Sequence, residues 1–523
     1  MRALLETMAL ALLAALASAA DSPVVTVTGG AVRGGLLAQG GAVFKGIPYA
    51  QPPAGDLRWR PPQAVKSWSG IRDAISFGAS CAQNAAGRML ASSSEDCLFL
   101  NVWTPEWPSP GRTPVMVWLH GGGNYGGTSA SFDGESLARH GVVLVTLNYR
   151  LTIFGFFAHP ELTRESPHHA SGNYGLMDQI AALQWVHDNI GRFGGDPSNV
   201  TLFGQSAGAV DADVLMTSPL AKGLFQRVIA ESGTVTRNPD AATLGMTALG
   251  AVMTVKAGAV SYSDAPGLAE AEKNGEALAA GDLQTLRALS AADLLQIAAA
   301  PHRSIGPANG VIVDGYVLPK PPAEVFAKGQ QHRVPLLIGN NSRERTPPQT
   351  TPEEVSAAMD AMYGPLASRA RTLYPITAAD PLYGGRAAQW VVDTMYRCPV
   401  VAQLVWQAAA GNPGYEYQFD HAPPGREALG AVHGAEVPYV FGSLGSQYGA
   451  AARDTSAALQ RYWTNFAKTG DPNGPDVPAW PKFEASARAY LEFTDHGPVA
   501  GEGLRRPYCD LYLDNVKRLQ AEP

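Results

Sequence analysis

The sequence contains little charge for its size and shows no pattern typical of a cofactor or metal protein. Only 16% of its 523 residues are charged, and the formal net charge is −7. A nucleic-acid partner needs a basic face, so this balance argues against one. After the first twenty residues no apolar run is long enough for a stable membrane span. The chain also lacks an H-E-x-x-H pair and a Walker-type loop, and we therefore predict neither a metal nor an organic cofactor.

Cysteine is scarce, with four residues in the whole chain: Cys81, Cys97, Cys398 and Cys509. No pair has the C-x-x-C spacing of a zinc or redox site. The even number is typical of a protein from an oxidising compartment, where disulfides persist. Spacing alone leaves three pairings open.

The N-terminus resembles a secretory signal at residues 1–20. Arg2 lies at its start, residues 8–16 are apolar, and Ala-Ser-Ala at 17–19 fits a small-residue cleavage site. Glu6 weakens the basic start, so a short amphipathic helix is the alternative interpretation. We expect the mature chain to be secreted or periplasmic.

Strand-like and helical patterns alternate along the mature chain. Four apolar runs are predicted strands, at residues 115–119, 142–147, 200–203 and 334–338. Continuous apolar runs are typical of parallel sheets buried on both faces. Residues 176–190, between the second and third runs, repeat apolar side chains at helical spacing, which completes a strand–helix–strand unit. We predict a single α/β domain over 21–523, with a large, mostly parallel central sheet, helices on both faces and insertions, including 236–290, that form a cap.

The pentapeptide GQSAG at 204–208 fits the G-x-S-x-G motif. The third predicted strand runs into it, and a helix-competent stretch at 207–216 leaves it. A sharp strand-to-helix turn would lift the hydroxyl of Ser206 clear of the sheet, and the small flanking residues would allow strand and helix to approach. The pentapeptide alone also fits an ordinary glycine-rich turn. Its setting predicts that Ser206 is a nucleophile.

A second motif, HGGG at 120–123, directly follows the first predicted strand. Glycines let the backbone approach a substrate and turn N–H groups toward it. We predict an oxyanion hole made by the N–H groups of Gly122, Gly123 and Ala207. A flexible loop is the alternative, but two motifs in the expected order argue against it. His120 is predicted to orient this loop and not to act as the base.

The acid and the base of such a site follow the serine in the chain. The candidate bases are His302, His332, His421, His433 and His496. Of these, His433 lies in a loop of small residues, GAVHG at 430–434, from which an imidazole projects freely. For the acid, Glu344 and Asp314 both follow apolar runs, and the pattern leaves both open. The alternative for each is a structural histidine or a solvated carboxylate.

Further blocks span nearly the whole mature chain. They are FKGIPYA at 44–50, SEDCLFLNV at 94–102, GNYGLMDQ at 172–179, FGGDP at 193–197, RYWTNF at 461–466 and GDPN at 470–473. Together they resemble the type B carboxylesterase family, which includes the cholinesterases. The resemblance implies an α/β-hydrolase fold and hydrolysis of carboxylic esters without a cofactor.

The resemblance also selects among the open candidates. The family's acid lies in a G-x4-E block, matched by 339–344, and its base in a G-x-x-H-G block, matched by 430–434. It therefore implies that Glu344 is the acid and His433 the base. It further implies two disulfides and two structural ion pairs, namely Cys81–Cys97, Cys398–Cys509, Arg58–Glu95 and Arg150–Asp178.

Several positions depart from the family pattern, and we assign three of them to the substrate pocket. Gln205 stands where glutamate is commoner, so one negative charge near the imidazolium is missing, which predicts altered pH dependence with activity retained. Arg345 follows the acid where glycine is usual, and it either pairs with a carboxylate or faces solvent. Asn124 stands where a bulky apolar residue is frequent, which would widen or polarise the site. In the cholinesterases a tryptophan in the loop matched by Cys81 to Cys97 holds a quaternary ammonium by a cation–π contact. This loop has no tryptophan, which argues against a choline ester as the substrate.

The predicted function is that of a secreted serine carboxylesterase acting on a small-molecule ester through an acyl-enzyme. In this mechanism His433 accepts the proton of Ser206, and Glu344 orients the imidazole and stabilises its charged form. One alternative is a non-catalytic adhesion or binding protein on the same fold, against which the intact triad counts. The other is hydrolysis of an amide or a thioester.

Overall fold

The structure is a computed structural model that describes residues 22–235, 266–278, 282–299, 310–344, 351–376 and 379–521. The predicted signal at 1–20 lies outside the described residues. So do Arg345, His302 and most of the predicted cap segment, 236–265 and 279–281. Along the described ranges, none of the helices combines the length and the apolar character needed to cross a membrane.

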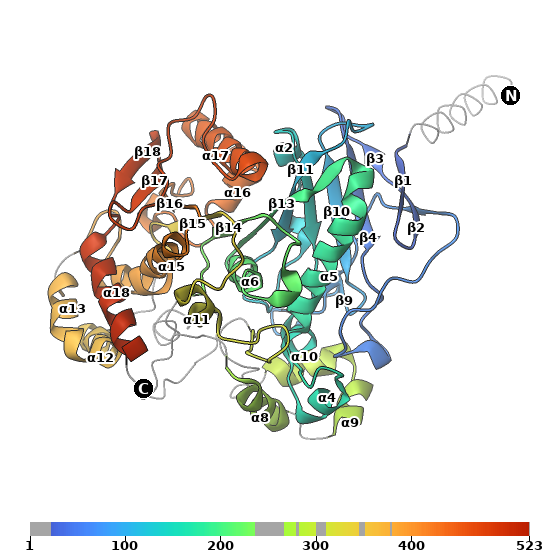
Figure 1. The fold of residues 1–523 in the computed structure, drawn as a ribbon, viewed down its shortest axis with the longest axis horizontal. Coiled ribbons are helices and arrows are strands. Elements are labelled where there is room, and N and C mark those ends of the chain that lie inside the picture. The colour runs from blue at the N-terminus through green and yellow to red at the C-terminus, as the bar shows by residue number, and fades with distance from the viewer. Residues whose placement is uncertain are drawn as a thin grey trace.

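A large sheet organises the described chain. Its strands are β3 (Gly35–Leu36), β4 (Ala42–Pro48), β10 (Phe99–Thr104), β11 (Thr113–Leu119), β12 (Val143–Leu147), β13 (Gly195–Gln205), β14 (Arg227–Glu231), β15 (Leu336–Asn341), β16 (Gly414–Phe419), β17 (Ala489–Thr494) and β18 (Gly497–Glu502). Their order across the sheet is β18-β17-β16-β15-β14-β13-β11-β12-β10-β4-β3. In Figure 1 the N-terminal strands, in blue, and the C-terminal strands, in red, therefore lie at opposite ends of the sheet.

The middle of the sheet is parallel, as predicted. From β12 through β11 and β13 to β17 every neighbouring pair is parallel. The pairs at either end, including β10 with β12 and β17 with β18, are antiparallel. The four predicted apolar runs fall on β11, β12, β13 and β15, although β13 is longer than predicted and β15 begins and ends later. Strands β11 and β12 are buried along most of their length, as expected where helical crossovers between parallel strands cover both faces of a sheet.

Helices cover both faces of the sheet, and the alternation of side chains along β11 separates two cores. Val115, Val117 and Leu119 pack in the core that also contains residues of α5 (Tyr174–Asn189), α6 (Ala207–Leu215) and α15 (Cys398–Ala409). Met116 and Trp118 pack on the other face with residues of α2 (Glu135–Ala138) and α17 (Ala450–Thr469). Side chains alternate across a strand, so one apolar run supplies both cores.

The described part of the predicted cap is helical. It contains α8 (Leu268–Leu278), α9 (Leu283–Ala288) and α10 (Ala291–Ala299). Helix α10 contacts α3 (Thr152–Phe156), and Arg287 of α9 forms an ion pair of 2.8 Å with Glu165 of α4 (Pro160–Glu165). In Figure 1 these helices gather below the sheet. The assignment of this segment as a cap stays a prediction.

Both disulfides and both ion pairs implied by the resemblance are present. Cys81–Cys97 closes a short loop, and Cys398–Cys509 joins α15 to α18 (Arg506–Ala521). Arg150 binds Asp178 through two hydrogen bonds of 2.7 and 2.8 Å. Arg58 donates to Glu95 at 2.8 and 2.5 Å and also to the carbonyls of Arg287 and Leu289 at the C-terminal end of α9. These contacts fix the segments around the sheet.

Candidate active site

Ser206 lies at a sharp turn between β13 and α6. Its backbone has φ 57° and ψ −121°, and α6 begins at the next residue. A positive φ is uncommon for a residue other than glycine and carries strain. Two backbone hydrogen bonds hold the turn. Ser206 N–H donates to the carbonyl of Glu231 at 2.8 Å, and the carbonyl of Ser206 accepts from Val210 N–H at 3.0 Å. This is the strand–turn–helix setting that the pentapeptide predicted.

The two glycines around Ser206 allow backbone to pack on backbone. A Cβ at Gly204 would lie 2.5 Å from the backbone of Gly208, and a Cβ at Gly208 would overlap the carbonyl of Leu119 at the end of β11. Real Cβ atoms do not make such contacts, so neither position accepts a larger residue without moving strand from helix. The G-x-S-x-G spacing is therefore required by the packing of β11, β13 and α6.

Three side chains that are distant in the chain meet at this turn. Nε2 of His433 lies 2.7 Å from Oγ of Ser206, and Nδ1 of His433 lies 2.5 Å from Oε2 of Glu344. The Glu344 side chain is fully buried, whereas the His433 side chain is 22% exposed. His433 N–H also donates to the carbonyl of Glu344 at 2.8 Å. The arrangement can move a proton from the hydroxyl to an imidazole that a buried carboxylate orients.

One amide joins the loops that carry the acid and the base. Nδ2 of Asn341 donates to the carbonyl of Val432 at 2.8 Å and to Oε2 of Glu436 at 2.6 Å. The backbone N–H of Asn341 donates to Oε1 of Glu344 at 2.7 Å. Asn341 thus fixes the carboxylate of Glu344 and the loop before His433 together.

Two more buried carboxyls lie beside this group, and sequence reasoning missed both. Burial, together with the nearby charge of Glu344, raises the pKa of Glu436 to about 7. Burial also raises the pKa of Glu231 well above its ordinary value. Ser232 donates to Glu436 at 3.0 Å, and Trp463 donates to Glu231 at 2.7 Å. Only Glu436 left a local signal, because it follows His433 by three residues in the same loop.

The HGGG loop passes directly over Ser206. Gly122 and Gly123 have φ 117° and 68°, and a Cβ at Gly121 would lie 3.1 Å from Cβ of Ser206. Among the described residues, the N–H groups of Gly122 and Gly123 donate to no acceptor. Ala207 N–H lies at the first position of α6, where helical N–H groups have no partner within the helix. These donors are free to bind an anionic oxygen near Ser206.

Of the three predicted pocket residues, the structure brings Gln205 to the imidazole. Its Nε2 lies 3.3 Å from Nε2 of His433, and its side chain is largely buried. Asn124 is turned inward instead, since its Nδ2 donates to Asp211 at 3.1 Å and its Oδ1 accepts from Tyr149 at 3.0 Å. The pocket role of Asn124 stays a prediction. Its side-chain contacts join the end of the HGGG loop to Asp211 and Tyr149.

His120 is a buried neutral residue of the same loop. Burial lowers its pKa to about 4, so it is uncharged at neutral pH. Its ring stacks on Tyr149 at a centroid distance of 4.6 Å, and its Nδ1 lies 2.9 Å from the carbonyl of Gly121. These contacts suit the orienting role predicted for it.

The other acid and base candidates have different partners. Asp314 accepts from the N–H groups of Tyr316 and Leu318 at 3.0 and 2.9 Å and so stabilises a turn. His421 binds Thr455 and Asp495.

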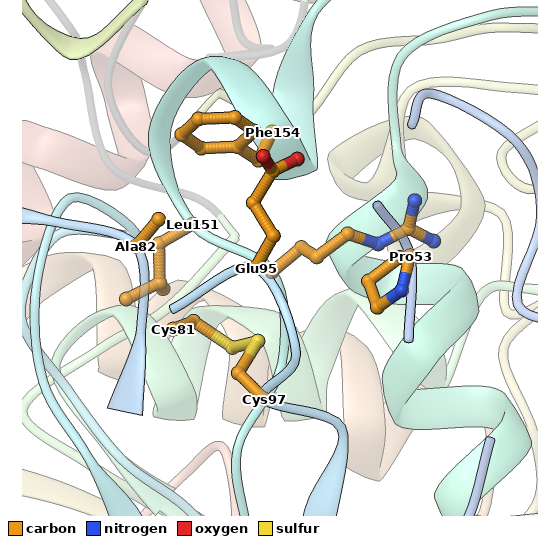
Figure 2. A pocket seen from close by; sticks show the side chains of 8 residues that line it. Pro53, Cys81, Ala82, Glu95, Cys97, Leu151 and Phe154 are labelled. Atoms are coloured by element: carbon orange, nitrogen blue, oxygen red, sulfur yellow. A yellow bond between two sulfur atoms is a disulfide. The ribbon is translucent and has the colours of Figure 1, made fainter. Parts of the chain in front are cut away.

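A separate recess lies beside the Cys81–Cys97 disulfide, and none of the three triad candidates lines it. Figure 2 shows its lining, which is Pro53, Cys81, Ala82, Glu95, Cys97, Arg150, Leu151 and Phe154.

Comparisons with known proteins agree on one family. The sequence model of the carboxylesterase family matches residues 21–364 and 377–512. The chain is 37% identical over 492 residues to fumonisin B1 esterase of Sphingopyxis macrogoltabida, covering 88% of this chain and 84% of that protein. It is 34% identical to carboxylesterase 1D of Rattus norvegicus, covering 88% of each. A solved structure of PNB esterase superimposes with a TM-score of 0.76 at 33% identity, covering 93% of this chain and 100% of that one.

Proposed function

The chain belongs to the carboxylesterase family and is a carboxylic ester hydrolase with the α/β-hydrolase fold, and from this premise we propose that it works through a triad of Ser206, His433 and Glu344. One observation carries the proposal, namely the continuous contact from Ser206 Oγ through both nitrogens of His433 to the buried Glu344. An imidazole in this position can accept the serine proton while its charged form is stabilised by the carboxylate.

In the first half-reaction, Oγ of Ser206 bonds to the ester carbonyl carbon as Nε2 of His433 takes its proton. The carbonyl oxygen becomes an oxyanion and accepts from the N–H groups of Gly122, Gly123 and Ala207. Removing one such donor typically costs about a hundred- to a thousand-fold in rate. The C–O bond to the alcohol then breaks, and His433 returns its proton to the leaving alkoxide. The product is an acyl-serine.

In the second half-reaction, water takes the place of the alcohol. His433 removes a proton from the water as its oxygen bonds to the acyl carbon, and the same N–H groups bind the second oxyanion. The bond to Oγ breaks, and His433 gives the proton back to Ser206. The net change is one ester and one water converted to one acid and one alcohol.

We propose a small-molecule ester as the substrate. The relative from Sphingopyxis macrogoltabida is named for fumonisin B1, and this ester is the first we would test. Gln205 beside the imidazole and Arg345 after the acid are consistent with a polar or acidic ester. We also propose that the mature chain is secreted or periplasmic, because two disulfides are typical of an oxidising compartment.

Replacing the nucleophile tests the triad. We expect Ser206→Ala to lower ester turnover by about four to six orders of magnitude while the unfolding transition is unchanged. An organophosphate should add one covalent adduct to the wild type at residue 206, measured by mass spectrometry. Ser218→Ala is the control, because that buried serine donates to Val317 at 2.7 Å and should leave the adduct unaltered.

The alternatives predict different outcomes of the same measurements. The adhesion or binding interpretation predicts no adduct and no ester turnover, and the esterase relatives of this chain argue against it. An amide or thioester hydrolase would form the adduct but prefer the matched amide or thioester of the same acyl group. Wild-type turnover by Ser206→Ala would end the triad proposal.

A further inference from the structure

Asp211 is a buried carboxyl on α6, the helix that begins next to Ser206. It is 0% exposed. Its Oδ2 accepts from Nε2 of Gln179 at 2.6 Å, and its Oδ1 accepts from Nδ2 of Asn124 at 3.1 Å. Both partners are neutral amides, so the carboxyl serves as an acceptor for groups from α5 and from the HGGG loop.

Asn124 is the point where this contact reaches the oxyanion loop. Its backbone is in the left-handed region, with φ 61°, and its carbonyl accepts from Thr152 N–H at 2.8 Å. The hydroxyl of Tyr149 lies 3.0 Å from Oδ1 of Asn124 and 2.7 Å from the carbonyl of His120. The segment from His120 to Asn124, which carries Gly122 and Gly123, is thus held at both ends.

The strain of this segment makes the side-chain contacts matter. Left-handed backbone is uncommon even for asparagine and is stabilised at Asn124 by its surroundings, since the three glycines before it have no conformational preference that would do so. A displacement of about 1 Å in a group that contacts the reacting atoms can reduce the rate about a hundred-fold. The contact from α6 ties the loop to the same helix that follows Ser206.

On the basis of the function proposed above, we propose that Asp211 is a positioning residue for ester hydrolysis. Through Asn124 it holds the N–H groups of Gly122 and Gly123 in line with Ser206. It touches neither substrate nor the reacting atoms. Its contribution is realised when the oxyanion forms, so it should appear in kcat more than in KM.

A neutral Asp211 can pair with the same groups as the acceptor described above. Tyr149 has a single hydroxyl proton but two oxygen neighbours, His120 O and Asn124 Oδ1. A protonated Asp211 can donate to Oδ1 of Asn124 once that amide is reversed, and Nδ2 then donates to Tyr149, whose proton goes to His120. Burial raises the pKa of Asp211 to about 7, so the neutral form is well populated near neutral pH. An asparagine at 211 can make the same contacts.

The test compares variants of the two partners with a matched control on the same helix. The set is Asp211→Ala, Asn124→Ala, the double variant, Asp211→Asn and the control Asp213→Asn. Asp213 is equally buried on α6, and no hydrogen bond joins its carboxyl to the loop among the described residues. Each protein is assayed for kcat and KM on a p-nitrophenyl ester. The affinity for a trifluoromethyl ketone, whose serine adduct carries an oxyanion, is measured as well.

We expect Asp211→Ala and Asn124→Ala each to lower kcat and trifluoromethyl ketone affinity about ten-fold, with KM within about two-fold. The double variant should lose much less than the product of the two single losses, because the contact between Asp211 and Asn124 is already absent in either single variant. Asp211→Asn and Asp213→Asn should stay within about two-fold of wild type.

Two results would overturn the positioning role: losses that multiply in the double variant, or single variants that behave as Asp213→Asn does. If Asp211→Ala does not fold, Asn124→Leu replaces it, and the role then requires loss with Asn124→Leu and retention with Asp211→Asn. Failure of the triad proposal looks different, since Ser206→Ala would then stay active.

Discussion

The two halves of the candidate active site are held in different ways. On the nucleophile side, β11, β13 and α6 pack backbone against backbone through Gly204 and Gly208. On the acid and base side, side chains hold the loops, since Asn341 binds Val432 and Glu436, and Arg343 donates to the carbonyls of Leu382 and Ala428 at 2.6 and 2.8 Å. One half is fixed by close approach of main chains and the other by polar side chains.

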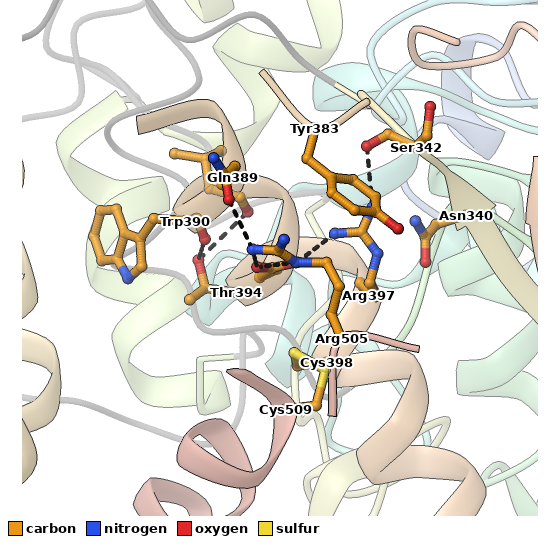
Figure 3. A network of polar contacts seen from close by, with 12 residues as sticks. Asn340, Ser342, Tyr383, Gln389, Trp390, Thr394, Arg397, Cys398, Arg505 and Cys509 are labelled. Carbon is orange, nitrogen blue, oxygen red and sulfur yellow. Dashed lines mark hydrogen bonds and ion pairs between the residues drawn. A yellow bond between two sulfur atoms is a disulfide. The ribbon is translucent and has the colours of Figure 1, made fainter. Parts of the chain in front are cut away.

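A buried charged network extends the support on the acid and base side. Arg397 is 0% exposed and donates to the carbonyl of Ser342 at 3.0 Å, two residues before the acid. It pairs with Asp393, which also binds Arg505 at 2.7 Å. Figure 3 shows Arg397 and Arg505 at the ring of Tyr383, close to the disulfide that joins α15 to α18. The loop of Glu344 is therefore tied to distant helices.

The difference explains which half leaves a motif in the sequence. Close backbone packing requires glycine at fixed spacing around Ser206, and such a requirement is readable in five consecutive residues. Support by side chains can come from any strand or helix that reaches the loop, and its members are scattered along the chain. Breaking each kind of support should therefore have effects of different size.

The largest effect is expected on the nucleophile side. In Gly208→Ala the new Cβ overlaps the carbonyl of Leu119, and α6 must move away from β11. We expect kcat/KM to fall about a hundred-fold or more and the free energy of unfolding to fall by about 3 kcal/mol. Denaturant unfolding and ester turnover measure the two. Gly191→Ala is the control, since a Cβ there meets open space. Equal stability of both variants would contradict backbone packing as the support.

An intermediate effect is expected on the acid and base side. Asn341→Ala removes the amide that joins the two loops and leaves Glu436 with one fewer donor. We expect kcat to fall about thirty-fold and the free energy of unfolding to fall by about 2 kcal/mol. Asn465→Ala removes a comparable amide-to-carbonyl bond at Pro472, away from the site, and serves as the control. If both variants lower kcat alike, the amide of Asn341 does not position the acid and the base.

The smallest effect is expected in the pH dependence of folding stability, through the buried carboxyls. Burial raises the pKa of Glu416 to about 8, so the folded chain retains a proton that the unfolded chain has lost above pH about 4.3. The unfolded state then binds fewer protons, and stability decreases as pH rises. The stabilisation is fully present below pH about 4 and is lost between there and pH about 8. Glu436 and Asp211, with pKa values of about 7, act in the same direction.

Replacing Glu416 separates this contribution from the chemistry. We expect Glu416→Gln to raise the Tm at pH 8 by about 2 °C or more and to leave the Tm at pH 5 nearly unchanged. Thermal unfolding at both pH values measures the difference. Asp211→Asn makes the same comparison for the nucleophile side. A constant Tm difference at both pH values would mean that packing, not proton binding, is responsible.

Much of the fold and of the candidate site could be predicted from local sequence. The apolar runs at β11 and β12 predicted strands buried on both faces, because short continuous apolar runs are typical of strands in a covered parallel sheet. The glycine spacings around Ser206 and in the HGGG loop predicted their turns. For Glu344 and His433, the local pattern left alternatives open, and only the resemblance to a family selected them.

The contacts that hold the site were decided by the tertiary structure. Glu231, Ser232, Asn341 and Glu436 reach the triad from β14, β15 and the loop after His433. The side chain of Asn124 points inward because its amide hydrogen-bonds to Asp211 and Tyr149, and no local sequence pattern predicts these partners. Local sequence determines which backbone shapes are permitted, since sterics act between neighbours. Which polar group satisfies a buried amide depends on residues that folding alone brings together.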